Sequence, residues 1–271
     1  HGLAEYHGRY NETARFLNNL GYLVFCNDHL GHGLHISDGK LKGFFKDENG
    51  YDAVVDQLAE MNSHIRKEYS SLNHYILSHS LGTSLTLSLL QRNVTFNGVV
   101  LSAAFSISPL FLLLNKLLLW PEYTFNDRKS LSNEMEKHTT LKHNSFFEPN
   151  RTTHDFLSRD KRKVDEYIED PLCGFIKTIQ LWKDLTVGFK HLWSKKSFLL
   201  MDQNIPFLVL TGNEDPINKN GKQAQKISNL LIDCGFKTEF TSFKGMRHEP
   251  LTELDRVIVM EKISEFFKSN N

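Results

Sequence analysis

The sequence predicts an α/β fold, in which a mostly parallel sheet carries helices on both faces and a helical cap is inserted into the chain. Short apolar runs of strand length alternate with segments of helical periodicity in residues 1–102 and again in 201–271. Residues 103–200 break this alternation, because they are rich in helix formers, aromatic and charged residues and hold no obvious buried strand. We therefore expect a core formed by 1–102 and 201–271, and a cap formed by 103–200.

Five runs predict the strands of the sheet. The first is a continuous apolar run, typical of a strand buried on both faces, and the last is more polar, as expected at a sheet edge. The predicted strands are 22–26, 75–78, 99–102, 207–211 and 238–243. Helical patterns lie around them at 12–19, 50–69, 83–91, 222–234 and 251–267.

Composition excludes several classes of function. The chain has 32 basic and 32 acidic residues, so a net charge of zero gives no bulk attraction to nucleic acid or to an anionic membrane. No apolar run approaches the roughly 20 residues of a membrane span. Three cysteines stand far apart without paired spacing, which predicts reduced thiols in a cytoplasmic protein: Cys26, Cys173 and Cys234.

The stretch HYILSHSLG, residues 74–82, organises the chain. An apolar strand pattern stops at Ser78-His79-Ser80, and a helical pattern starts directly afterwards. This is the strand–turn–helix context of a nucleophile elbow, in which a sharp turn raises the Ser80 hydroxyl above the carboxyl edge of the sheet. Small residues are needed two positions before and after the serine, and Ser78 and Gly82 meet that need.

Two later loops follow predicted strands and complete a Ser…Asp…His order. Asp215 lies in GNEDP and His248 in GMRHE. Groups at strand ends gather at the carboxyl edge of an open α/β sheet. We expect His248 to accept the Ser80 proton and Asp215 to orient the imidazole. Glu214 is the competing acid, and Asp215 is preferred because it precedes Pro216 and its shorter side chain suits a tight turn.

An oxyanion intermediate requires two preorganised donors. The residue after the nucleophile supplies one through its backbone, which predicts the N–H of Leu81. The other must come from a loop after an earlier strand, and His1-Gly2-Leu3 is the candidate. We expect the N–H of Leu3 to be the second donor.

Six segments together resemble the monoacylglycerol lipase/lysophospholipase group of bacterial α/β-hydrolases, which is often labelled serine aminopeptidase-like. They are HGLAEYHGRY, NDHLGHG, SHSLGT, DEYIEDPLCGF, GNEDP and GMRHE. The resemblance implies an α/β-hydrolase fold with a helical cap. It also implies the roles given above for Ser80, Asp215, His248, Leu3 and Leu81.

The resemblance further implies that Glu5 and Arg9 shape the polar, glycerol-side end of a substrate site. Ser78 departs from the family pattern, which has glycine there, and Thr83 stands where glycine or serine is usual. Both residues are small enough for the elbow to form.

The expected function is hydrolysis of carboxylic esters of single-chain lipids, without cofactor or metal. His29, His32 and His35 repeat every three residues, but we interpret them as part of a glycine loop rather than as metal ligands. Two alternatives stay open: an aminopeptidase-like enzyme whose cap acids would hold a free amine, and an inactive binding protein on the same scaffold. The basic run at 159–163 fits a solvated helix face better than a site for a phosphate headgroup.

The run LFLLLNKLLLW, residues 110–120, is nearly apolar all round. As a helix it needs cover on more than one side, either from the rest of the cap or from an acyl tunnel on one side and a lipid surface on the other. The second interpretation predicts transient membrane contact by a cytoplasmic, peripheral protein. It also predicts that Leu113→Asp or Leu117→Asp weakens long-chain esters most.

In the fold that the chain resembles, the strand that ends at the His1-Gly2 turn lies between the first two predicted strands. We therefore expect that strand and others, about three in all, to precede His1 in a longer native protein, and the 271 residues alone to aggregate through unpaired edges.

Overall fold

The computed structural model describes residues 1–37 and 39–271. Within this part of the chain, four parallel strands form one sheet in the order β1-β2-β3-β4. They are β1 (Tyr75–His79), β2 (Gly98–Ser102), β3 (Phe207–Gly212) and β4 (Thr238–Phe243). These strands confirm four of the five predicted runs, and the more polar β4 lies at an edge, as expected.

The prediction of a strand at residues 22–26 is wrong. No strand is assigned to this segment, and the side chains of Leu23 and Phe25 are 59% and 46% exposed. A strand forms only against a hydrogen-bonded neighbour. Among the described residues β1 pairs with β2 alone, so the apolar run has no ladder to join.

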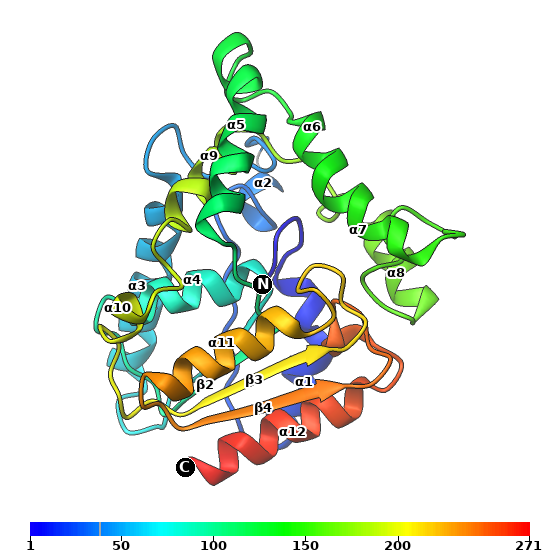
Figure 1. Ribbon diagram of the computed structural model, residues 1–271. Coiled ribbons are helices and arrows are strands. Elements are labelled where there is room, and N and C mark those ends of the chain that lie inside the picture. Colours follow the sequence, from blue (N-terminus) through cyan, green and yellow to red (C-terminus); the bar gives the residue numbers. More distant parts are fainter. Residues whose placement is uncertain (38) are drawn as a thin grey trace.

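Helices cover both faces of the sheet, which is the arrangement that the alternating pattern predicts (Figure 1). Side chains alternate between faces along each strand. In β2, Val99 and Leu101 point toward one cluster, and Val100 points toward the other. The first cluster also contains side chains of α3 (Gly50–Glu68), α4 (Leu81–Leu90) and α11 (Lys222–Asp233). The second contains side chains of α1 (Asn11–Asn19) and α12 (Arg256–Ser269).

Between β2 and β3 the described chain is helical, apart from one isolated bridge that pairs Leu131 with Thr178. The helices there are α5 (Pro109–Phe125), α6 (Asn133–Glu136), the π-helix η2 (Lys137–Leu141), α7 (Lys142–Asn144), the 3-10 helix η3 (Ser145–Phe147), α8 (Lys161–Glu169), α9 (Ile179–Gly188) and α10 (Lys195–Phe198). The remaining short elements are η1 (His7–Tyr10), α2 (Leu34–Ser37) and η4 (Pro250–Thr252). The division into core and cap stays a prediction. Of the described helices, none combines the length and apolar character needed to cross a membrane.

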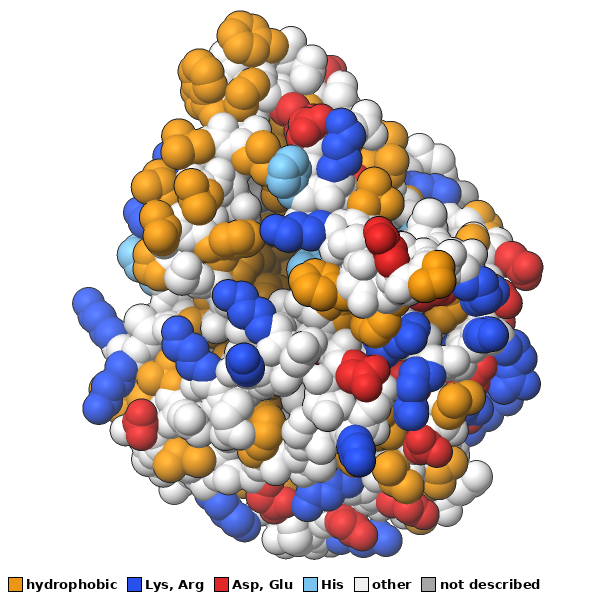
Figure 2. Space-filling view, turned by 45° about the vertical axis from the view of Figure 1, so that its right-hand side comes forward, with side chains coloured by type: hydrophobic (Ala, Val, Ile, Leu, Met, Phe, Trp, Pro, Cys, Tyr) orange, Lys and Arg blue, Asp and Glu red, His pale blue; other side chains and the backbone are white. Residues whose placement is uncertain are grey.

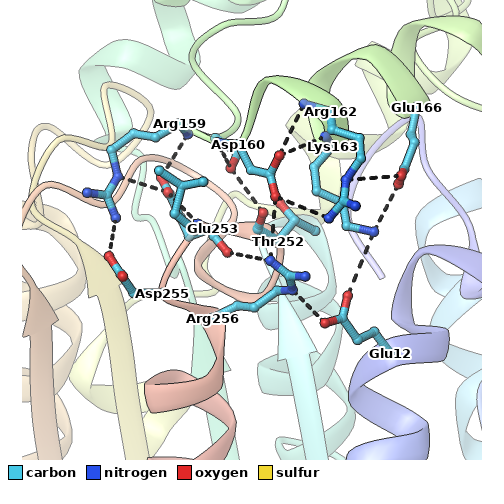
Figure 3. A network of polar contacts seen from close by, with 12 residues as sticks. Glu12, Arg159, Asp160, Arg162, Lys163, Glu166, Thr252, Glu253, Asp255 and Arg256 are labelled. Carbon is cyan, nitrogen blue, oxygen red and sulfur yellow. Dashed lines mark hydrogen bonds and ion pairs between the residues drawn. The ribbon is translucent and has the colours of Figure 1, made fainter.

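The basic run at 159–163 is held in ion pairs, which Figure 3 shows from close by. Arg159 pairs with Glu253 at 2.9 Å and with Asp255 at 3.0 Å. Lys163 pairs with Glu166 at 2.9 Å and lies 3.7 Å from Glu12 on α1. The run therefore joins α8 to α1 and to the segment before α12, and its charges are largely neutralised.

Candidate active site

The turn after β1 is a strained elbow. Ser80 has φ 49° and ψ −117°, a conformation that costs a non-glycine residue on the order of 1–3 kcal/mol and is common at functional sites. The Ser78 hydroxyl donates to the carbonyl of Val100 at 3.2 Å, so the serine in place of glycine is satisfied inside the turn. A Cβ on Gly82 would lie only 2.8 Å from the carbonyl oxygen of His1, which explains the glycine there.

The elbow, the loop after β3 and the loop after β4 meet at one point. His248 Nε2 lies 2.9 Å from Ser80 Oγ, and His248 Nδ1 lies 2.9 Å from Asp215 Oδ2. Asp215 is fully buried and also accepts from the backbone N–H of Ile217 at 2.9 Å. The competing acid, Glu214, is exposed. The structure thus brings together the three side chains that the sequence singles out, and it places Asp215 against the histidine.

The two histidines near Ser80 have pKa values that are shifted in opposite directions. Burial alone would lower the pKa of His248, but the charge of Asp215 and its hydrogen bond raise it above the usual value. Burial and the neighbouring His248 lower the pKa of His79 to about 3, so His79 is neutral near pH 7. A proton shared at this site therefore resides on His248.

Leu3 and Leu81 both line the cavity that contains Ser80. Leu81 is the first residue of α4, where an N–H has no partner within the helix. Ala4 has φ 56°, and its carbonyl accepts from Gly174 N at 2.9 Å and from Tyr167 Oη at 3.0 Å. These contacts fix the turn that carries Leu3.

Glu5 and Arg9 have different positions relative to the cavity. Glu5 is buried, lines the cavity and accepts from the backbone N–H of Gly2 and from Tyr10 Oη. Arg9 is not among the lining residues. Its guanidinium pairs with Glu249, lies 3.6 Å from Glu5 and stacks over Tyr167 at 4.8 Å. Burial opposes its charge, but Glu249 and Glu5 raise the pKa of Arg9. Arg9 therefore pairs with both Glu5 and Glu249 without lining the cavity itself.

The cavity has a volume of about 910 Å³, near the upper end of the roughly 300–1,000 Å³ usual for small-molecule sites. Its walls are mainly apolar and aromatic. The apolar wall includes Phe105, Phe111, Leu114, Leu118, Phe156, Trp182, Leu185 and Phe189. Figure 2 looks into the hollow: hydrophobic side chains line it and gather above it, and Lys and Arg side chains stand along its lower edge.

Helix α5 presents different faces to the cavity and to solvent. Ser108 caps its N-terminus by accepting from Phe111 N, with Pro109 in the first turn. The side chains at 111, 114, 115 and 118, spaced as one helical face, line the cavity. Leu113 and Leu117 do not line it and are 53% and 61% exposed. The expectation that these two leucines form an acyl wall is therefore wrong. A run that is apolar on all sides does not show which face of the helix points toward the cavity.

Several cavity residues were not found by reasoning from the sequence. They include Lys142, His143, Lys219, Lys222 and Lys226. The basic residues that follow Asp215 in PINKNGKQAQK were an available signal, because they continue the acid loop into the next helix. Lys142 and His143 had no such signal, since they lie far away in the sequence.

The three histidines of the glycine loop contact separate partners. His29 Nε2 lies 3.0 Å from the carbonyl oxygen of His1, and His32 Nδ1 lies 3.0 Å from that of Leu30. His35 Nε2 lies 2.8 Å from the side-chain amide of Gln57. Among the described residues, no group of three metal-ligating side chains comes together.

A serine on a strand–turn–helix elbow, hydrogen-bonded to a histidine and then to an aspartate at the carboxyl ends of parallel strands, defines the α/β-hydrolase fold. The chain belongs to the family described as "Serine aminopeptidase, S33", whose model matches residues 1–255. The predicted fold class and family are thus confirmed.

Known proteins agree with this assignment. The chain is 32% identical to the monoglyceride lipase of Rattus norvegicus over 222 residues, 79% of this chain and 63% of that protein. It thus spans less than two thirds of that relative. A carboxyl esterase from Bacillus coagulans, solved in complex with glycerol, superposes with a TM-score of 0.86 at 20% identity, covering 98% of this chain and 88% of that one. The monoacylglycerol lipase of Paleococcus ferrophilus gives a TM-score of 0.73 at 22% identity, covering 100% and 93%. The two solved structures share the fold with this chain.

Proposed function

We propose that this protein is a serine hydrolase that cleaves carboxylic esters of single-chain lipids, monoacylglycerol or lysophospholipid, through an acyl-enzyme on Ser80. One observation carries the proposal: the hydrogen-bonded series Ser80–His248–Asp215 opens into a large apolar cavity. The similarity to a monoglyceride lipase supports the same class of substrate.

The mechanism follows from the geometry. Ser80 Oγ attacks the ester carbonyl while His248 Nε2 takes its proton, and Asp215 stabilises the imidazolium that results. The N–H groups of Leu3 and Leu81 are the proposed donors to the oxyanion. When the tetrahedral intermediate collapses, His248 returns the proton to the leaving alcohol. A water molecule, deprotonated by His248, then attacks the acyl-enzyme in the same way, which releases the fatty acid and restores Ser80.

The cavity suits an acyl chain because its walls are mainly apolar. Each methylene group removed from water contributes about 0.8 kcal/mol, so affinity rises with chain length until the wall is covered. Glu5, held by Arg9 and Tyr10, provides a polar point in the same cavity, and we propose that it faces the glycerol side of the substrate. Arg9 then acts by positioning Glu5.

The peptidase alternative is not favoured. A free substrate amine would need an unpaired acid in the cavity, yet the four acids of residues 103–200 considered for that role are each paired with a cation. The pairs are Glu134–Lys137, Glu136–Lys177, Asp165–Arg151 and Glu166–Lys163. None of these acids is among the lining residues. An inactive binding protein would not need the aligned Ser80–His248–Asp215 series.

The outer face of α5 supports contact with a lipid surface. Leu110, Leu117 and Trp120 are 67%, 61% and 59% exposed, while the opposite face of the same helix lines the cavity. A lipid surface in contact with this face would bring the esters that it contains next to the cavity. We propose transient peripheral membrane contact of this kind. The three free cysteines support a cytoplasmic location.

The experiment compares three substrates with purified protein: 1-lauroylglycerol, p-nitrophenyl laurate and an aminoacyl naphthylamide. The proposal predicts Ser80-dependent turnover of both esters and turnover of the amide at least about 100-fold slower in kcat/KM. Faster turnover of the naphthylamide than of either ester would establish the peptidase instead.

A further inference from the structure

Four lysines at the mouth of the cavity are unneutralised. Lys219, Lys222 and Lys226 come from the loop after Asp215 and the first turns of α11, and Lys142 comes from α7. All four side chains line the cavity and are exposed. Within the part of the chain that the structure describes, none of them has a carboxylate within 4.0 Å. We refer to these four residues as the lysine rim.

The other charged side chains that line the cavity have partners of opposite charge. Lys177, which also lines it, is buried and paired with Glu136. The two acids among the lining residues, Glu5 and Glu249, share the single guanidinium of Arg9, so one negative charge remains there against the four positive charges of the lysine rim. In the basic run at 159–163, Arg159, Arg162 and Lys163 pair with acids (Figure 3). The lysine rim therefore leaves a net positive charge at the opening, although the whole chain has a net charge of zero.

We propose that the lysine rim recognises the anionic headgroup of the substrate, so that the enzyme prefers a lysophospholipid carrying a phosphate monoester to a neutral monoacylglycerol. This inference rests on the proposed ester hydrolysis at Ser80 and names its substrate class.

The placement follows from the cost of burying charge. A phosphate cannot enter the apolar interior without losing several kcal/mol of hydration, so it stays at the opening when the acyl chain lies against α5. There it meets the four lysines of the rim, which line the cavity and are exposed. Exposed ion pairs are individually weak, about 0.2–1 kcal/mol, but several converge on one phosphate.

The test measures a selectivity ratio: kcat/KM for 1-lauroylglycerol-3-phosphate divided by kcat/KM for 1-lauroylglycerol. Both esters are kept below their critical micelle concentrations. The test variant is Lys222→Gln/Lys226→Gln, which keeps helix propensity nearly unchanged. The control, Lys195→Gln/Lys196→Gln, removes the same charge from exposed lysines of α10 that do not line the cavity.

We expect the ratio to exceed one in the wild type, to fall about tenfold in the test variant, and to stay unchanged in the control; roughly threefold per exposed ion pair gives that value. Raising the salt concentration from 50 to 500 mM should lower the wild-type ratio, and should lower that of the test variant less, because the variant keeps only Lys142 and Lys219 of the rim. An equal loss on both esters, or no loss, would overturn the inference.

Binding separates failure of this inference from failure of the proposed hydrolysis. Isothermal titration calorimetry measures the affinity of the protein for the non-hydrolysable ether 1-O-dodecylglycerol-3-phosphate and for its analogue without the phosphate. If the wild type cleaves neither ester, the proposed function fails. Tighter binding of the phosphate ether, lost in Lys222→Gln/Lys226→Gln, would still support the rim.

Two further arms distinguish other sources of negative charge. Inorganic phosphate that binds as tightly as the phosphate ether would indicate a free-phosphate site and contradict the lipid headgroup. The second arm uses vesicles of phosphatidylglycerol and phosphatidylcholine. If the test variant loses only vesicle binding and keeps the ratio on dissolved esters, the rim serves a membrane surface and the inference is wrong.

Discussion

Leu114→Asp tests whether the inner face of α5 holds the acyl chain. Leu114 lines the cavity and is 51% exposed, so an acyl chain lying on it would bury about half of the side chain. Half of the roughly 1.5–3 kcal/mol for burying a leucine is about 1 kcal/mol. Desolvating the introduced carboxylate costs about 1–2 kcal/mol more. The total of about 2–3 kcal/mol is a loss of about 30- to 150-fold in kcat/KM.

The assay is a kcat/KM series on dissolved p-nitrophenyl esters from two to twelve carbons. Leu114→Asp should lose that factor on the longest esters and less than about threefold on acetate, because acetate does not reach α5. The control is Leu113→Asp, which makes the same change on the same helix at 53% exposure, away from the cavity. Equal losses of Leu114→Asp at every chain length would mean that the packing around α5 had collapsed, and would refute the assignment of the acyl chain to this face of the helix.

Three other outcomes are expected. Because the pKa of His248 is raised and neutral His248 is the base, kcat/KM should rise with pH through a midpoint above about 6.5; a midpoint below 6 would contradict the Asp215 pairing. The same shift stabilises the fold at low pH, and this contribution is lost as pH rises through the folded pKa. Gly82→Ala should lower stability by about 1–3 kcal/mol in thermal unfolding, because its Cβ would meet the carbonyl of His1, and an unchanged melting temperature would argue against this contact. Leu117→Ser/Trp120→Ser should weaken sedimentation with lipid vesicles at least about tenfold while p-nitrophenyl acetate hydrolysis is retained; undiminished sedimentation would exclude this face from lipid contact.

The elbow and its partners could be predicted because their signals are local. An apolar strand, a small-residue turn and a helix stand consecutively around Ser80, and Asp215 and His248 each follow a strand of the same parallel sheet. The order of three strand ends then determines that the groups meet. Distances of 2.9 Å on both sides of His248 agree with that reasoning.

Other features depend on neighbours that the sequence does not identify. Residues 22–26 have the composition of a buried strand, yet a strand also requires a paired edge, and Phe25 is 46% exposed. The run at 110–120 predicts a helix but not its rotation, so the pattern does not distinguish Leu113 and Leu117 from Leu114 and Leu118, which line the cavity. Lys142 and Lys222 line one cavity although 80 residues separate them in the sequence, and only the folded chain brings α7 and α11 to the same opening.

The central claim is that Ser80 is the nucleophile, and labelling with a fluorophosphonate tests it most directly. The labelled residue is identified by peptide mass spectrometry in the wild type and in the variants Ser80→Ala and Ser78→Ala. Ser78 is the matched control, because it lies two residues away in the same elbow with its hydroxyl donated to Val100. We predict a single label on Ser80 in the wild type and in Ser78→Ala, and none in Ser80→Ala, whose esterase kcat falls by roughly 10⁴- to 10⁶-fold. Labelling of another residue, or more than a tenth of the esterase activity in Ser80→Ala, would contradict the claim.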